Sequence, residues 1–213
     1  MPILLVVDLL AEREAFGKKG VEEIVSHFPE HEVLLWAPHT NQQIEYGFGK
    51  RVDAPQNCDV VVITGSRRNV SSWEDWMDDV AKLIRECEVP LYGICFGHQI
   101  ICKALGGEVK RAEEGSSFLA DVTYTDGTVK KQLFTHQDHV IDSGEMEVMA
   151  SSEHCEIAVC KHPTRPIKTV QFHPEATKFV LDYSLRCGDM TEDERNEFAD
   201  GIQDDNVAQS LLN

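Results

Sequence analysis

The sequence lacks any apolar run of the roughly 18 residues that a membrane-spanning helix needs. Its first residues, Met1 to Asp8, also lack the basic segment and small-residue cleavage site that are typical of a secretory signal peptide. They are apolar instead, and predict a first buried strand. We therefore expect a soluble protein of the cytoplasm.

Basic residues are scarce. The chain has 20 Lys and Arg against 37 Asp and Glu, a formal net charge of −17. Proteins that bind the phosphate backbone need clustered Lys and Arg, so nucleic acid is excluded as a partner. The seven cysteines follow no disulfide framework, which indicates free thiols in a reducing compartment. No C-x-x-C pair occurs to complete a metal-ligand pattern, and we expect neither a metal nor a cofactor.

The 213 residues suffice for one well-cored domain, and we expect a single domain over residues 1–213, with a weakly specified tail at 204–213. In the first half, short apolar runs alternate with segments of helical period. This alternation predicts an α/β fold with a flavodoxin-like, doubly wound, mostly parallel sheet. The expected strands are residues 3–8, 32–37, 59–64 and 89–94, and the expected helices are residues 19–28, 73–87 and 99–105.

After Gly107 the pattern changes to short strand-like runs separated by turn signals, which predict a small antiparallel extension. One more apolar strand is expected at residues 167–172, followed by a helix at 176–186. Thr191 and Glu194 form a capping-box pattern that predicts the start of a last, acidic helix. The segment 39–56 has no clear period and is expected to be mostly loop.

Cys95 lies between the strand at 89–94 and the helix at 99–105, with Gly93 and Gly97 two positions to either side. This is the G-x-S-x-G nucleophile elbow with cysteine in place of serine. The helix N-terminus favours a thiolate there. Two alternatives remain open from the residues alone: a buried core cysteine, or a metal ligand together with His98 and Cys102, which share its helical face.

A cysteine hydrolase also needs a base to accept the thiol proton and a group to orient that base. His173 follows the last predicted strand of the sheet, at the same edge as Cys95. Glu175, two residues further, can hold its imidazole. The alternative is that His173-Pro174-Glu175 is a surface turn.

Together these motifs resemble the class I, triad-type glutamine amidotransferases, whose G-x-C-x-G-x-Q and H-P-E patterns match in order and spacing. The segments ITGS at 63–66, GICFGHQIICKALGG at 93–107 and THQDHV at 135–140 are most similar to the GMP-synthase-type glutaminase and to γ-glutamyl peptidases. The resemblance implies catalytic residues Cys95, His173 and Glu175. It also implies an oxyanion hole from the backbone of Gly65 and Phe96, and substrate contacts from Ser66, Gln99, Gln137, Asp138 and His139.

The implied reaction is hydrolysis of the glutamine γ-amide through a γ-glutamyl thioester on Cys95, with ammonia passed to a separate ATP-dependent synthetase. A free-standing γ-glutamyl peptidase is the alternative, and an inactive binding module is a remote third. Two departures bear on this choice. Gly65-Ser66-Arg67-Arg68 replaces the Gly-Gly-Pro turn of many relatives, with Arg67 and Arg68 as candidate contacts for a substrate carboxylate, and no S-G-G-x-D-S loop for ATP occurs on this chain.

Overall fold

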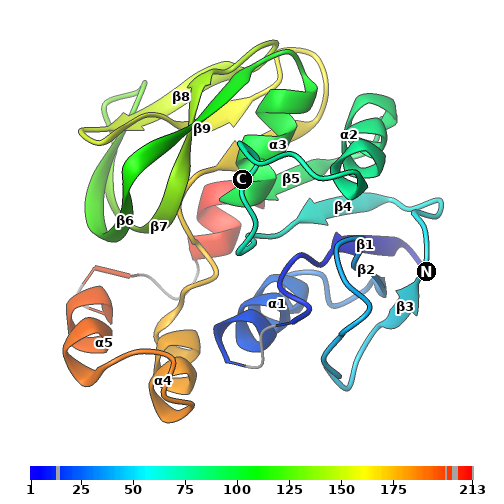
Figure 1. The fold of residues 1–213 in the computed structure, drawn as a ribbon, viewed down its shortest axis with the longest axis horizontal. Coiled ribbons are helices and arrows are strands. Elements are labelled where there is room, and N and C mark those ends of the chain that lie inside the picture. Colours follow the sequence, from blue (N-terminus) through cyan, green and yellow to red (C-terminus); the bar gives the residue numbers. More distant parts are fainter. Residues whose placement is uncertain (13–14, 200, 203–205, 213) are drawn as a thin grey trace.

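A computed structural model describes residues 1–12, 15–199, 201–202 and 206–212, in which ten strands form one sheet of order β3-β2-β1-β4-β5-β10-β9-β8-β6-β7 (Figure 1). Six of these strands run parallel to one another: β1 (Ile3–Val7), β2 (Glu32–Trp36), β3 (Lys50–Val52), β4 (Val60–Ile63), β5 (Leu91–Ile94) and β10 (Ile167–Val170). When these strands are numbered along the chain with β3 left out, their order in the sheet is 2-1-3-4-5, which is the flavodoxin-like arrangement. The predicted fold class is confirmed.

The remaining four strands form the antiparallel part: β6 (Glu108–Tyr124), β7 (Val129–Asp142), β8 (Glu147–Ser152) and β9 (Cys155–Lys161). They continue the same sheet beyond β10 and are more extensive than the small extension expected. The sequence separates β6 into two short runs, but the structure joins them, with an irregular stretch between Arg111 and Ser116 where the pairing with β7 shifts.

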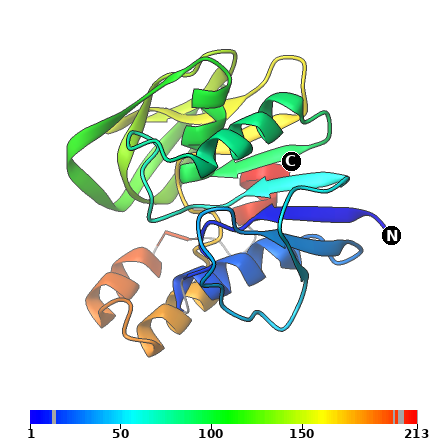
Figure 2. The same ribbon diagram turned by 45° about the vertical axis from the view of Figure 1, so that its right-hand side comes forward.

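Helices cover both faces of the parallel strands, as the turned view in Figure 2 shows. On one face lie α2 (Trp76–Glu86) and α3 (Phe96–Ala104), and on the other lie α1 (Phe16–Ser26) and α4 (Lys178–Arg186). Successive residues of β1 alternate between two hydrophobic clusters, because neighbouring side chains of a strand point to opposite faces. None of the helices in the described residues is long and apolar enough to cross a membrane.

The last elements pack beside the sheet. The short helix α5 (Glu192–Ala199) begins with the predicted capping box, in which the Thr191 hydroxyl and backbone N–H both donate to Glu194. Its Phe198 joins Leu133 and Leu181 in a third hydrophobic cluster. In the tail, Val207 and Leu211 are buried against the core, Leu211 from the single-turn π-helix η1 (Ala208–Leu212), while residues 203–205 and 213 lie outside the described part.

The segment 39–56 contains one element that the sequence pattern did not predict. The three-residue strand β3 pairs with β2 at the edge of the sheet. Arg51 of β3 reaches inward and binds the buried carboxylate of Asp8, at 2.7 Å, at the end of β1. An ion pair across strands so far apart in the chain leaves no local sequence signal.

Candidate active site

Three segments that follow neighbouring parallel strands meet at one edge of the sheet: Gly65 after β4, Cys95 after β5 and His173 after β10. A Cβ placed on Gly65 would lie 3.0 Å from Cε1 of His173 and 3.8 Å from Cβ of Cys95, so the three residues are in contact. Open α/β sheets bind ligands at this carboxyl edge. The structure therefore brings the predicted nucleophile, base and oxyanion-hole glycine together.

Cys95 has the strained backbone of a nucleophile elbow. Its φ is 51° and its ψ is −99°, and it is the only residue other than glycine with positive φ among the described residues. A Cβ on Gly97 would lie 2.2 Å from the carbonyl oxygen of Ile63, and a Cβ on Gly93 would clash with Gly97 and the Ile101 side chain. Both glycines are therefore required by close packing, and a strained residue held in this way is typical of a functional site.

The Cys95 thiol lies at the N-terminus of α3 and is 5% exposed. Its Sγ lies 3.8 Å from the carbonyl oxygen of Thr135 in β7, which accepts a weak hydrogen bond from it. Thr135 was not predicted as a site residue. It begins the THQDHV segment at 135–140, but its contact with Cys95 joins chain segments that are 40 residues apart.

His173 and Glu175 form a buried pair beside this thiol. Nδ1 of His173 donates to Oε1 of Glu175 at 2.8 Å, which leaves Nε2 as the nitrogen available for proton transfer. Glu175 is fully buried and His173 is nearly so, with the ring of Phe16 packed edge-on against the imidazole. Burial alone would lower the pKa of His173, but the charges of Glu175 and Cys95 outweigh it and raise this pKa well above its ordinary value.

The segment after β4 is attached to β7 by a buried carboxylate. Oδ2 of Asp138 accepts the backbone N–H of Ser71 at 2.7 Å, and Oδ1 accepts the Ser71 hydroxyl at 2.8 Å. Arg111 lies 3.8 Å from Oδ1. The Asp138 side chain therefore holds the loop that carries Gly65, and its contact with a substrate stays a prediction.

The other predicted substrate residues are placed as follows. Gln99 is buried, and its amide donates to the Asp138 carbonyl and to Gln171. The Gln137 side chain donates to the backbone carbonyls of residues 112 and 113 in β6. His139 packs against His136, with ring centroids 4.5 Å apart, and Ser66 lines a pocket together with His173. Their roles in binding stay predictions.

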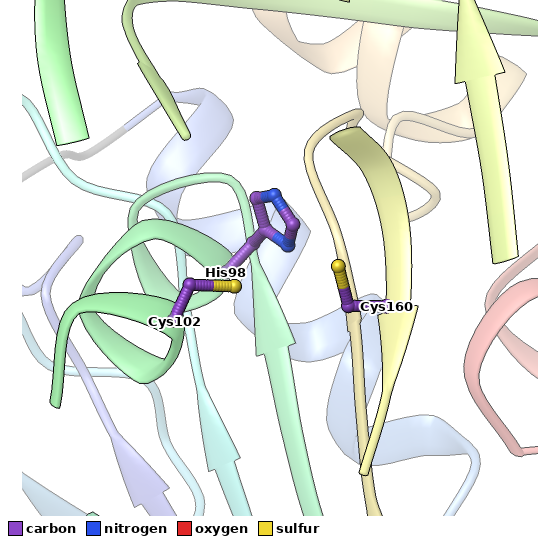
Figure 3. A group of neighbouring side chains, drawn as sticks. All are labelled: His98, Cys102 and Cys160. Atoms are coloured by element: carbon purple, nitrogen blue, oxygen red, sulfur yellow. The ribbon is translucent and has the colours of Figure 1, made fainter. Parts of the chain in front are cut away.

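Two of the three candidate metal ligands lie together in the structure, but with Cys160 in place of Cys95. His98 and Cys102 gather with Cys160 of β9, whose side chain points toward α3 in Figure 3. Nε2 of His98 donates to the carbonyl of Ile157 at 3.0 Å, so Nδ1 accepts the Thr169 hydroxyl at 2.8 Å. Both nitrogens are thus engaged, and burial lowers the pKa of His98 to about 4. His98 acts here as a neutral link between α3 and the strands β9 and β10.

Comparison with known proteins identifies the family to which the chain is similar. The family model described as glutamine amidotransferase class I matches residues 24–185. A glutamine-hydrolyzing GMP synthase subunit from Methanothermobacter thermautotrophicus is 38% identical over 101 residues, which are 43% of this chain and 54% of the relative. The corresponding protein from Sulfolobus acidocaldarius is 34% identical over 136 residues, 59% of this chain and 72% of the relative.

The similarity to the first of these relatives therefore spans about half of its length. Among solved structures, a glutamine amidotransferase from Thermotoga maritima aligns over 99% of this chain and 94% of its own, with a TM-score of 0.72 and 18% identity. A putative GMP synthase subunit from Thermoplasma acidophilum aligns over 93% and 91%, with a TM-score of 0.64 and 20% identity. At these identities the structural likeness concerns the fold alone.

Proposed function

Because the chain belongs to the class I glutamine amidotransferase family, we propose that it cleaves the γ-amide of glutamine through a γ-glutamyl thioester on Cys95. The observation that carries the proposal is the strained elbow of Cys95 placed against the buried His173–Glu175 pair. A thiol, a base and an orienting carboxylate in this order are the parts that acyl transfer to cysteine requires.

In the first step, His173 takes the thiol proton and the Cys95 thiolate attacks the γ-carbonyl carbon. The raised pKa of His173 favours the imidazolium that this transfer creates. Negative charge develops on the carbonyl oxygen, and we assign the backbone N–H groups of Gly65 and Phe96 to stabilise it. The bond from the γ-carbon to nitrogen then breaks, and His173 returns its proton to the leaving ammonia.

In the second step, water attacks the thioester carbon while His173 accepts a proton from it. The carbon–sulfur bond breaks, glutamate leaves, and the thiol is restored. Glu175 keeps the imidazole in one tautomer throughout, because its hydrogen bond fixes the proton on Nδ1. The GMP synthase relatives support the additional proposal that the ammonia passes to a separate ATP-dependent synthetase chain.

A second candidate is the hydrolysis of larger γ-glutamyl compounds by the same residues, without a synthetase. It is favoured by one observation, a pocket beside His173 that ammonia would not fill. Both candidate reactions acylate Cys95. They differ in the leaving group, which is ammonia for glutamine and a larger amine for the other γ-glutamyl compounds.

The acylation step can be tested with diazo-oxo-norleucine, an electrophilic glutamine analogue. Mass spectrometry of the treated protein should place one adduct on Cys95, and Cys95→Ser should abolish labelling while the melting temperature is kept. Cys187→Ser, which removes the exposed cysteine, serves as the matched control and should label normally. An adduct on Cys102 or Cys187 with Cys95 unmodified would overturn the proposal.

A further inference from the structure

A pocket of about 370 Å³ opens beside the catalytic histidine, between β7, the loop after β4 and the C-terminal helices. His173, Thr135 and Ser66 line its end nearest the nucleophile. Most of the remaining wall is apolar, from Leu10, Phe16, Leu133, Leu181, Met190 and Phe198. Met190 and Phe198 come from the C-terminal segment, so the acidic helix α5 contributes its apolar side to this pocket.

The position of the pocket relative to the reaction decides what it can hold. Acylation requires the leaving nitrogen to receive a proton from His173, so any substituent on that nitrogen extends to the His173 side of the nucleophile. The pocket lies on that side, and Cys95 is not among the described residues that line it. Ammonia is about the size of a water molecule, roughly 30 Å³. Ammonia would leave most of this space unfilled, and a larger leaving group could occupy it.

The pocket also contains a polar group without a partner. Oγ of Ser184 in α4 is fully buried and has no hydrogen-bond partner among the described residues. Because Ser184 is 0% exposed, this hydroxyl does not reach the open space of the pocket in this structure. The exposed residues Arg67 and Asp189 supply one cation and one anion to its wall. The apolar wall suits a large apolar side chain, and Arg67 is the lining residue that can pair with the carboxylate of a leaving amino acid.

We propose that this pocket binds the leaving group of a γ-glutamyl dipeptide whose second residue has a large apolar side chain, as in γ-glutamyl-phenylalanine. The proposal rests on the proposed acylation of Cys95. Thiolate attack breaks the bond between the γ-carbon and the phenylalanine nitrogen, and His173 protonates that nitrogen. Free phenylalanine leaves, and water releases glutamate from the thioester.

The first experiment compares γ-glutamyl-phenylalanine with γ-glutamyl-glycine, which has the same amide and carboxylate but no side chain, and with glutamine. Burial of a phenylalanine side chain should raise kcat/KM on the order of ten- to a hundredfold over the glycine substrate. Equal values for the two dipeptides would overturn the proposal.

The second experiment fills the pocket. Met190→Trp enlarges a half-buried residue of its wall, and Ser184→Leu fills it from α4. Each should lower the kcat/KM ratio of the phenylalanine to the glycine substrate by about tenfold. Phe179→Trp is the matched control, because Phe179 is 55% exposed on α4 and is not among the residues lining the pocket, and it should leave the ratio unchanged.

If the filled variants lower the rates for all three substrates equally, the pocket holds the shared glutamyl group and the proposal is wrong. That result differs from a failure of the proposed function, in which diazo-oxo-norleucine does not label Cys95. Two independent variants keep the test decisive if one of them unfolds, and thermal melting of each identifies that case.

Discussion

Gly65 and His173 pack so closely that a single added methyl group on Gly65 would lie 3.0 Å from the imidazole ring. The two residues follow different strands, β4 and β10, on either side of the strand that ends at Cys95. His173, the proposed base, can lie close to Cys95, the proposed nucleophile, because residue 65 has no side chain. Gly65 therefore matters for the position of the imidazole as well as for its proposed backbone N–H contact with the oxyanion.

Gly65→Ala should displace the His173 ring, since a Cβ contact of 3.0 Å requires something to move. Acylation by diazo-oxo-norleucine should slow by about 10- to 100-fold, as expected when a catalytic group shifts by a fraction of an ångström or more. Gly115→Ala is the control, because its added Cβ would meet only ordinary contacts at 3.9 Å or beyond. If Gly65→Ala is acylated at a rate within twofold of the unmodified protein, the imidazole tolerates the added methyl group and this prediction is wrong.

Glu175→Gln should lower the pKa of His173, because the carboxylate is one of the charges that raise it. Since a raised pKa keeps the imidazole protonated to higher pH, its loss should move the titration of His173 to lower pH, measured by NMR of the ring Cε1 proton. Acylation should fall, but by distinctly less than the several orders of magnitude expected for His173→Ala.

Glu156→Gln removes an exposed carboxylate instead and is the control for net charge. If Glu175→Gln leaves both the titration and the acylation rate unchanged, another group orients the imidazole and Glu175 is only a buried acid at the end of a strand.

The sequence predicts those parts of the fold and of the site that are determined by residues close together in the chain. The turn at Cys95 follows from an apolar strand, two glycines and a helix, all within a few residues, and the capping box from Thr191 to Glu194 spans four residues. The apolar runs of the parallel strands are equally local, because strands buried on both faces are apolar throughout. These features are recognisable without tertiary information.

The parts that escaped prediction depend on contacts between distant segments. The Asp138–Ser71 bond joins residues 67 apart in sequence, and Thr135 meets Cys95 over 40 residues. The apolar pocket is built from four separate stretches of chain, and only folding reveals that α5 contributes to it. The strand β3, three residues long, is too short to show a period of its own.

Asp138→Asn tests the attachment of the loop after β4, which carries Gly65, to β7. An Asn side chain keeps one oxygen for the backbone N–H of Ser71, and its NH2 group can pair with the Ser71 hydroxyl only if that hydroxyl turns from donor to acceptor. Both hydrogen bonds to a charged oxygen are therefore lost. Urea unfolding should show a loss of about 1–3 kcal/mol. The acylation rate should fall as well, because Gly65 lies in the same loop.

Ser71→Ala is the matched variant, since it removes only the hydroxyl bond and keeps the backbone bond to Asp138. It should cost less than Asp138→Asn in both measurements. If Asp138→Asn raises KM for glutamine while stability and the rate of acylation at saturation stay unchanged, Asp138 binds substrate directly and does not act through the loop.

His98 makes the stability of the fold depend on pH. It is fully buried between α3 and the strands β9 and β10, and burial lowers its pKa to about 4, below its ordinary value of 6.5. The unfolded chain therefore takes up a proton at this residue before the folded chain does. Stability from the neutral imidazole is fully present above pH 6.5 and is lost as the pH falls towards 4.

When the pH falls from 7 to 5, this residue alone should lower the free energy of unfolding by about 2 kcal/mol. His98→Asn should be less stable at pH 7, because the bonds to Thr169 and Ile157 are weakened, but it should lose about 2 kcal/mol less than the unmodified protein on acidification to pH 5. Urea unfolding at the two pH values measures both. Thr169→Val, which keeps the imidazole and removes only its hydroxyl partner, should retain the full pH dependence. If His98→Asn loses as much unfolding free energy between pH 7 and pH 5 as the unmodified protein, the pH dependence comes from other buried groups.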